Sequence, residues 1–278
     1  MVKYLLRKNA TMKNTDCTAL VCSCDKYHDV ERPFISLWHR FWPDCPLETV
    51  LLSETLSTEG FDRIVLTGPG KTWCEMLAEA LAQIDTPYVL LLMNDYFLNA
   101  QVDTKAFLKR LDEAKRFNAA SLRLNPLPKG RKPWRVADLM EMPKNVAYCV
   151  TCQTSIWNRE FLLDLARRNK SAWEFERYGS FMTGGEKRPL LVTQAKEFPF
   201  VDAVHKGYWE KFGLEVCREN GIDLAGITRT LPPFKARVVE GAKAVAFKML
   251  PTTLLVRFQN RFGLGAKEQP RPVRKETE

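Results

Sequence analysis

The sequence predicts an α/β domain built on a mostly parallel central sheet that is flanked by helices. Short apolar runs alternate with amphipathic segments along the first half of the chain. The run YVLLLM (88–93) is apolar without alternation, which is typical of a strand buried on both faces of a sheet. With 278 residues, of which 45% are hydrophobic, the chain can bury a substantial core.

The elements of this domain follow from local patterns. Pro33 is suited to the first turn of a helix, and this helix is expected to stop at the breaker PDCP (43–46). After Lys71, apolar residues recur at helical spacing. The basic, Pro-rich stretch 125–145 is expected to be a long loop. Strands are expected at 17–25, 47–54, 62–67, 86–98 and 119–124, and helices at 33–42, 73–84 and 103–117.

Composition limits the classes of function. The chain has no run of about 18 apolar residues, so no bilayer span is expected, and residues 1–16 lack the apolar core of an export signal. Most of the eight cysteines lie in apolar runs, where buried thiols are ordinary. Cys149 and Cys152 form a C-x-x-C without a matching second pair, which disfavours zinc. A reduced, cytoplasmic protein is expected.

The formal net charge of +9 indicates an anionic partner: nucleic acid, a phosphorylated substrate or a membrane surface. Nucleic-acid binding is the main non-enzymatic alternative. The basic residues gather in the tails and in the 129–135 loop, and no helix-turn-helix, zinc-finger or RNP-like motif accompanies them.

The stretch GPGKT (68–72) raises the question of a phosphate site. An ATPase P-loop requires a glycine five residues before Gly70, and that position is Val65. A strand, a Gly-Pro-Gly turn and a helix N-terminus could still offer backbone N–H groups to a phosphate beside Lys71. The alternatives are a tight strand-to-helix turn or a P-loop-like nucleotide-binding protein.

Four segments, in this order, resemble the GT-A class of nucleotide-sugar glycosyltransferases, and in particular a bacterial branch found in capsule and lipopolysaccharide assembly. They are SCDKYHDVERPFISLWHRFWPDCP, WCEMLAEALAQIDTPYVLLLMNDYF, TCQTSIWNREFLLDL and SAWEFE, within residues 17–210. The resemblance implies transfer of a sugar from a nucleotide-sugar donor, first of all a UDP-sugar, to a hydroxyl of a glycan or lipid-linked glycan.

The resemblance also implies a donor site. The class places an acidic D-x-D at the end of a strand to meet the sugar diphosphate, whereas this chain has Asn94 and Asp95. Either Asp95 and the diphosphate hold Mg²⁺ or Mn²⁺, with His205 as a further ligand, or side-chain cations replace the metal. Lys71, Arg123 and His205 are the candidate cations. Asp95 could instead only cap a turn. The implied donor-binding residues are Asp25, Lys26, Tyr27, Lys71, Trp73, Asn94, Asp95 and Arg123.

The acceptor side is implied by the motif WEFE (173–176). Transfer with inversion needs a carboxylate that takes the proton of the acceptor hydroxyl, and Glu174 or Glu176 could serve. Whether transfer inverts or retains configuration stays open. Trp173 could stack on a sugar face, and Gln153 and Trp157 could line the same pocket. The alternative is an amphipathic helix start whose acids lie in solvent.

The chain is expected to divide into an N-terminal extension (1–16), a transferase domain (17–230), amphipathic helices (231–264) and a disordered tail (265–278). Apolar residues such as Val238, Val245 and Leu254 recur beside basic ones, as in helices that lie in the interface of an anionic membrane. The protein is therefore expected on the inner face of the cytoplasmic membrane. A helix packed on the domain, or a dimer contact, is the alternative, and the oligomeric state stays open.

Overall fold

The computed structural model describes residues 13–224, 229–231 and 233. The chain divides into two compact units, residues 1–228 and 229–278. The helices and the tail expected beyond residue 233 lie outside the described residues, as do residues 1–12. Within the described part, no helix combines the length and the apolarity needed to cross a bilayer.

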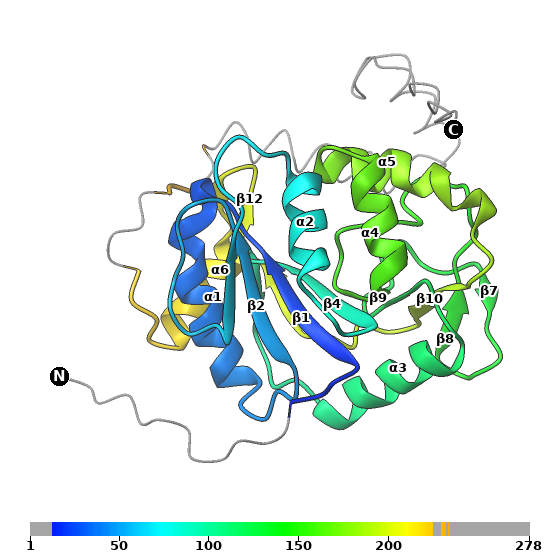
Figure 1. Cartoon of the computed structure of the whole chain (residues 1–278). Helices are drawn as coiled ribbons and strands as arrows, with labels where there is room; N and C mark the ends of the chain where they lie inside the picture. Colours follow the sequence, from blue (N-terminus) through cyan, green and yellow to red (C-terminus); the bar gives the residue numbers. More distant parts are fainter. Residues whose placement is uncertain (1–12, 225–228, 232, 234–278) are drawn as a thin grey trace. The chain divides into compact units, whose positions relative to one another are not determined.

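The centre of the first unit is a nine-stranded sheet with the order β3-β2-β1-β4-β9-β6-β10-β8-β7 (Figure 1). Strands β3, β2, β1 and β4 are mutually parallel, and β6 and β10 are parallel to each other. β9 runs antiparallel to both β4 and β6, and β8 runs antiparallel to β10 and β7. The expected α/β class with a mostly parallel sheet is confirmed. The strands are β1 (Cys17–Cys22), β2 (Glu48–Ser53), β3 (Arg63–Leu66), β4 (Tyr88–Met93), β6 (Ser121–Arg123), β7 (Lys132–Pro133), β8 (Leu139–Glu141), β9 (Ser155–Asn158) and β10 (Leu190–Thr193).

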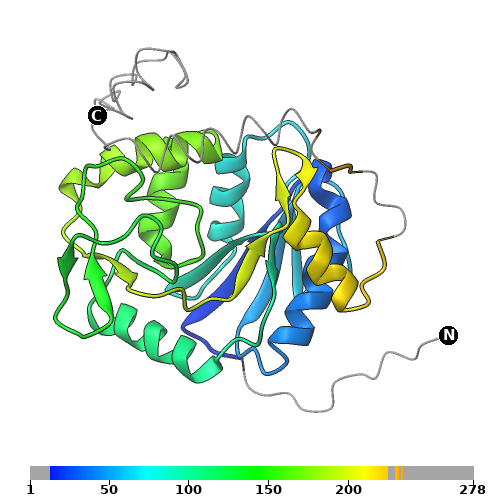
Figure 2. The same cartoon turned by 180° about the vertical axis from the view of Figure 1, so that it is seen from behind.

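Helices cover both faces of this sheet. α2, α4 and α5 lie on the face seen in Figure 1, and α1, α3 and α6 lie on the face seen in Figure 2. Alternate residues of β1 enter two separate cores: Ala19 and Val21 join one, and Leu20 and Cys22 join the other. The helices are α1 (His28–Phe41), α2 (Trp73–Ala82), α3 (Thr104–Arg116), α4 (Arg159–Arg168), α5 (Ala172–Met182) and α6 (Lys211–Glu219), with short 3-10 turns η1 (Asp25–Tyr27) and η2 (Thr183–Gly185).

Three expected elements are corrected. α1 begins at His28, not at Pro33, because the missing N–H of Pro33 removes only one intrahelical bond and the helix continues past it. The stretch 125–145 contains the β7–β8 hairpin and is not only a loop. The strand expected over 86–98 is interrupted after Met93, and its last residues form a separate strand, β5 (Tyr96–Leu98).

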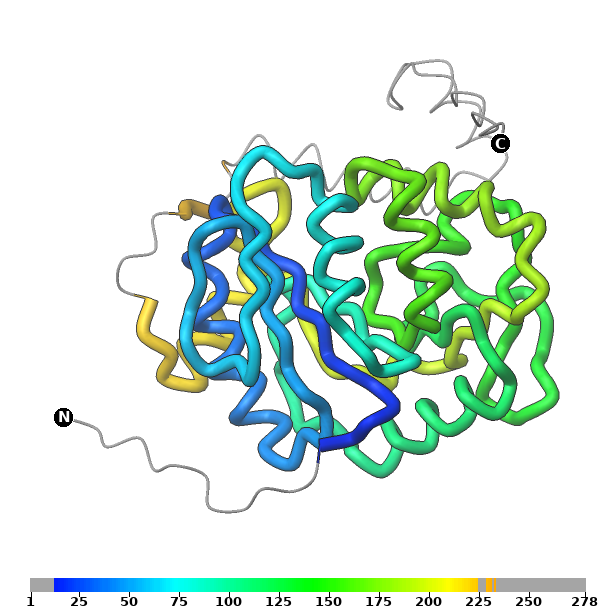
Figure 3. The backbone as a smooth tube through the Cα atoms, in the orientation of Figure 1, coloured from blue at the N-terminus to red at the C-terminus, as the bar shows by residue number. Residues whose placement is uncertain are grey.

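β5 leaves the central sheet and pairs antiparallel with β11 (Phe200–Asp202), so that Asp202 lies opposite Tyr96. The backbone N–H of Ala203 then donates to the carbonyl of Asp95 at 2.8 Å. A hairpin of β12 (Val204–His205) and β13 (Tyr208–Trp209) follows. The path of the backbone in Figure 3 shows how the chain returns from the green second half to the ends of the blue strands. Residues about 100 positions apart therefore meet beyond the end of β4.

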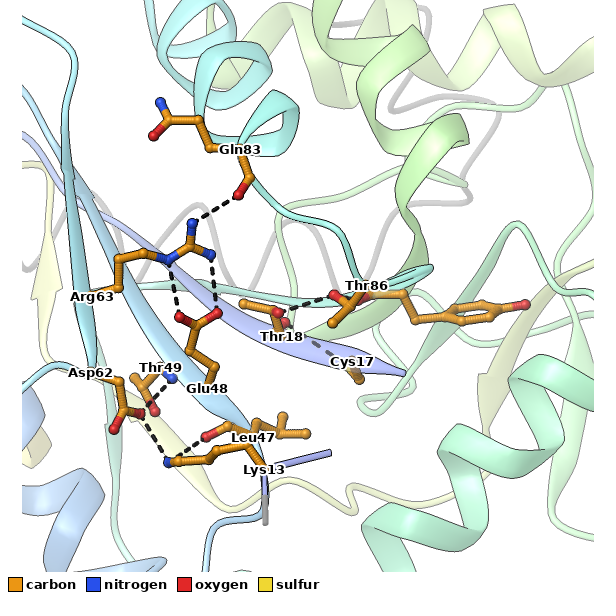
Figure 4. Close-up of polar contacts among 11 residues, drawn as sticks. Lys13, Cys17, Thr18, Leu47, Glu48, Thr49, Asp62, Arg63, Gln83 and Thr86 are labelled. Atoms are coloured by element: carbon orange, nitrogen blue, oxygen red, sulfur yellow. Dashed lines mark hydrogen bonds and ion pairs between the residues drawn. The ribbon is translucent and has the colours of Figure 1, made fainter. Parts of the chain in front are cut away.

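Polar side chains brace the opposite, amino-terminal end of β2 and β3 (Figure 4). Arg63 donates from Nε and Nη2 to the two oxygens of Glu48, both at 3.0 Å, and from Nη1 to the carbonyl of Gln83 at 2.8 Å. Asp62 accepts from Lys13 Nζ at 3.0 Å and from the N–H of Thr49 at 2.8 Å. These contacts hold the amino-terminal ends of the first strands together. They do not involve the carboxyl ends of the strands.

Candidate functional site

The carboxyl ends of β1 and β4 are joined by a buried polar cluster. Asn94 donates from Nδ2 to Ser23 Oγ at 2.8 Å and to the carbonyl of Tyr27 at 3.0 Å. Ser23 Oγ donates to Glu31 Oε1 at 2.6 Å, and His28 Nδ1 lies 3.1 Å from the other oxygen of Glu31. The amide of Asn94 thus holds the loop after β1. Ser23 and Glu31 were not candidates from sequence, since neither a serine after a strand nor a glutamate in a helix gives any sign that it is buried.

Asp25 links the loops that follow β1 and β2. Its carboxylate accepts from the N–H groups of Thr55 and Leu56, both at 2.9 Å, and from the Thr55 hydroxyl. Its own N–H donates to Glu54 Oε2 at 2.9 Å. The hydrogen bonds from Thr55 and Leu56 hold the pKa of Asp25 below its ordinary value. The exposed Lys26 and the half-buried Tyr27 follow Asp25 in η1. The three predicted donor residues therefore lie together at the sheet edge where β1, β2 and β4 end.

The GPGKT segment folds as a tight turn. Gly68 and Gly70 adopt φ values of +81° and +82°, which favour glycine. Thr72 caps α2 in a capping box with Glu75, and the N–H of Cys74 donates to the carbonyl of Lys170 at 2.9 Å. Lys71 forms an ion pair with Glu79. The first-turn N–H groups of Cys74 and Glu75 already have acceptors, and Val65 lies inside β3, so the geometry favours a structural turn over a phosphate cradle.

Of the two glutamates in WEFE, only Glu176 reaches the loops at the sheet edge. Its Oε1 accepts the N–H of Cys152 at 2.8 Å. Burial raises the pKa of Glu176, while the N–H of Cys152 and the positive charge of Arg123 act in the opposite direction. Burial also raises the pKa of Tyr96, and the charges of Asp95 and Glu176 contribute to that rise. Asp95 and Glu176 therefore both interact electrostatically with Tyr96.

Glu174 has a different place. WEFE is the first turn of α5, in which Ser171 Oγ accepts the N–H of Glu174 at 3.1 Å and Glu174 Oε2 accepts the N–H of Lys170 at 2.9 Å. Two residues apart on a helix, the two acids point in different directions. Trp173 is 47% exposed, and the Arg177 guanidinium lies 4.8 Å from its ring centroid. Glu174 caps the helix, whereas Glu176 faces inward.

Of two predicted aromatic residues, Trp157 belongs to the core and the partly buried Trp73 packs against it. The Trp157 ring is 1% exposed and packs against Phe161 and Phe175 with centroid distances of 6.1 Å and 5.8 Å. Trp73, at the start of α2, contacts the edge of the same Phe175 ring at 5.5 Å. Because β9 is covered by α4 and α5, Trp157 has no surface that could line an acceptor pocket.

A cleft of about 580 Å³ opens beside Asp202 and Gln153. Burial raises the pKa of Asp202, and the charges of Lys196 and His205 counteract the rise. His205 is exposed on β12. Sequence patterns had not indicated Lys196 and Asp202, which are brought together where Lys196 donates to the carbonyl of Phe200 in β11. The cleft is lined by Asn125, Pro126, Leu127, Gln153, Lys196, Phe200, Val201, Asp202, His205, Glu210 and Phe212.

The side chains do not by themselves make a cation site. Among residues 13–224, 229–231 and 233, no group of three or more His, Cys, Asp or Glu side chains could hold a metal ion. The amide of Asn94, which was expected beside Asp95 as a possible ligand, is engaged with Ser23 and Tyr27. All eight cysteines are free thiols, six of them buried. Within this described part, the side chains alone therefore supply too few ligands to hold a divalent cation.

No family model matches the chain. No curated protein matches it either. Among solved structures, residues 1–349 of TarS from S. aureus are 12% identical over 68% of this chain and 59% of that chain, with a TM-score of 0.42. The structure of the same TarS fragment in complex with UDP-GlcNAc is 13% identical over 68% of this chain and 57% of that chain, with a TM-score of 0.42.

A cytidylyltransferase from Leptospira borgpetersenii is 11% identical over 77% of this chain and 99% of that chain, with a TM-score of 0.40. The chain spans about 59% of the length of the TarS fragment. These similarities are distant.

Proposed function

We propose that the protein is a nucleotide-sugar glycosyltransferase that acts in surface polysaccharide synthesis. The observation that carries the proposal is the place of Glu176. Glu176 accepts the N–H of Cys152 at the carboxyl edge of the sheet. Gln153, which follows Cys152 in the chain, lines the open cleft. In open α/β sheets, ligands bind beyond the carboxyl ends of the strands. An acid with a raised pKa beside a cleft is suited to proton transfer.

In the proposed reaction Glu176 is the general base. An acceptor hydroxyl oxygen attacks the anomeric carbon of the donor sugar, while Glu176 takes the hydroxyl proton. The bond between the anomeric carbon and the diphosphate oxygen breaks, and its electron pair leaves with the nucleoside diphosphate. Because the acceptor oxygen displaces the diphosphate in a single step, from the face of the anomeric carbon opposite the leaving group, this reaction inverts the configuration of the sugar. A base with a raised pKa accepts the proton more readily than an ordinary glutamate.

The donor is proposed to bind where the loops after β1, β2 and β4 meet. Asp25, Lys26 and Tyr27 would face the nucleotide, and Asp95 would lie at the sugar diphosphate. A nucleotide could compete with Thr55 and Leu56 for the Asp25 carboxylate, which is exposed at the sheet edge. The acceptor glycan is proposed to occupy the cleft that Gln153 and His205 line, and the exposed Trp173 is proposed to stack on a face of one of its sugars.

A thermal-shift screen of nucleotides tests the proposal. One of UDP, GDP and CMP should raise the melting temperature, with UDP as the first candidate, and a ligand at 100 times its Kd adds about 2.7 kcal/mol of stability. Each nucleotide is measured with and without Mn²⁺, which reports whether a metal completes the site. Stabilisation by oligonucleotides alone, lost as salt rises, would favour nucleic-acid binding instead.

We further propose that residues beyond 233 hold the protein on the inner face of the cytoplasmic membrane. The support is the sequence pattern of apolar and basic residues in 238–262. A protein truncated after Leu231 should still bind nucleotide but no longer sediment with anionic vesicles at low salt. The full-length chain with neutral vesicles is the control. If the full-length protein does not sediment with anionic vesicles at low salt, the proposed membrane anchor is wrong.

A further inference from the structure

Arg123, at the end of β6, is one of the most buried charges in the described part of the chain, with 4% of its surface exposed. Its Nη1 donates to the carbonyls of Leu127 and Pro128, both at 3.3 Å. Its Nη2 donates to the carbonyls of Tyr148 and Cys149 at 3.3 Å and 2.8 Å. One guanidinium therefore ties the segment after β6, which forms a wall of the cleft, to the segment that leads into Cys152 and Gln153.

These four acceptors are neutral, so they satisfy the hydrogen bonds of Arg123 but not its charge. Among the described residues, no carboxylate lies within ion-pair distance of its guanidinium. Arg110, a second buried arginine, is different, because it pairs with Glu113 at 2.7 Å and Glu197 at 2.5 Å. A buried charge without a counter-charge is costly. The carboxylate whose charge acts on Arg123 is that of Glu176.

We propose that Arg123 is a positioning residue for the reaction: it fixes the loop that presents the Cys152 N–H to Glu176, and it places a positive charge on the same loop that holds this acid. This role differs from contact with the donor diphosphate, because both Nη atoms already donate to carbonyls. The proposal for Arg123 deepens the proposed function. It rests on that function only where it predicts an effect on turnover. The Glu176 carboxylate accepts the N–H of Cys152, from the segment before β9, and interacts electrostatically with Arg123 from β6 and Tyr96 from β5; the charge of Asp95 acts on Tyr96 and Cys152 as well.

The direction of the effect follows from these neighbours. Burial raises the pKa of Glu176 and the positive charge of Arg123 lowers it. Without Arg123 the pKa should rise further, because the positive charge and the held N–H of Cys152 both lower it. Less of the base would then be ionised at neutral pH. The acid limb of the kcat/KM profile would move to higher pH, whereas a purely structural defect would lower kcat/KM at every pH.

Titration of Glu176 tests this directly. The full-length protein is labelled with ¹³C at glutamate side-chain carboxyls, and the signal of Glu176 is identified by its loss in Glu176→Gln. In Arg123→Met its midpoint should lie at higher pH than in wild type, whereas Arg123→Lys, which keeps the charge, should lie closer to wild type. Arg110→Met, the matched control, removes an equally buried cation on α3 and should leave the midpoint unchanged. An unchanged midpoint in folded Arg123→Met overturns the proposal.

A second measurement needs no change at Arg123. The ¹⁵N signals of its guanidinium, assigned in wild type, should shift as Glu176 titrates, and this shift should be absent in Glu176→Gln. If the ¹⁵N signals of Arg123 do not shift as Glu176 titrates, the proposal is overturned, even where Arg123→Met does not fold. The two hypotheses fail separately. Coupled titrations without any sugar transfer would refute the proposed function alone, and a transferase that needs Glu176 but shows no coupling would refute the role of Arg123 alone.

Discussion

Glu176→Gln is expected to lower turnover on the order of 10²-fold or more, whereas Glu174→Gln should leave it nearly unchanged. The amide keeps the size of the side chain and can still accept the N–H of Cys152, but it cannot take a proton. Glu174 is the matched control, since it lies in the same turn of α5 and its carboxylate caps the helix at Lys170. Release of nucleoside diphosphate from the donor found in the nucleotide screen measures both variants, and donor affinity should be little changed.

The stability of Glu176→Gln supplies an independent control. Since the pKa of Glu176 is raised in the folded state, any stability linked to its protonation is fully present below the ordinary glutamate pKa. It is lost as pH rises through the raised pKa. At neutral pH the amide removes a partly buried charge, so the variant should melt no lower than wild type. The melting temperatures of the variant and of wild type, plotted against pH, should converge under acid conditions. Wild-type turnover in both glutamine variants would mean that the base lies elsewhere.

The sequence was sufficient to predict the first half of the fold for a physical reason. A strand buried on both faces, such as β1 or β4, must be apolar throughout, and that pattern is visible without the structure. The capping box at Thr72 likewise marks the start of α2 locally. The β7–β8 hairpin was not predicted, because β7 has only two residues, both exposed, and β8 has only three, which is too short to show an apolar alternation.

The site was harder to predict because it depends on contacts between distant segments. WEFE alone gives no way to separate the helix cap Glu174 from the inward Glu176, which is distinguished by its bond to Cys152, 24 positions away. Lys71 stands beside glycines in sequence, which suggested a phosphate site. In the structure it pairs instead with Glu79, a residue of α2. From sequence alone Trp157 is a plausible pocket residue. Its burial depends on α4 and α5, which pack over β9.

Asp95→Ala is expected to abolish sugar transfer while the fold stays intact. The structural bond of this residue to β11 is made by its backbone, whose carbonyl accepts the N–H of Ala203 at 2.8 Å, so the side chain can be removed without breaking it. Asp95 follows β4 at the carboxyl edge, and with Glu176 its charge acts on Tyr96. The Asp95 carboxylate would stabilise the positive charge that develops at the anomeric carbon of the sugar in the transition state, and losing such a group costs roughly 10²–10³-fold in kcat.

The measurement is again release of nucleoside diphosphate, with circular dichroism and the melting temperature as checks of the fold. Asp164→Ala is the control, because Asp164 lies on α4 in a surface pair with Arg168 at 2.8 Å, and such pairs contribute about 0–1 kcal/mol to stability. Asp164→Ala should retain wild-type turnover. The same nucleotide should still bind Asp95→Ala through the loops after β1 and β2, since their link through Asp25 and Thr55 does not involve Asp95. A folded Asp95→Ala protein with normal turnover would show that the reaction, if it occurs, takes place away from the end of β4.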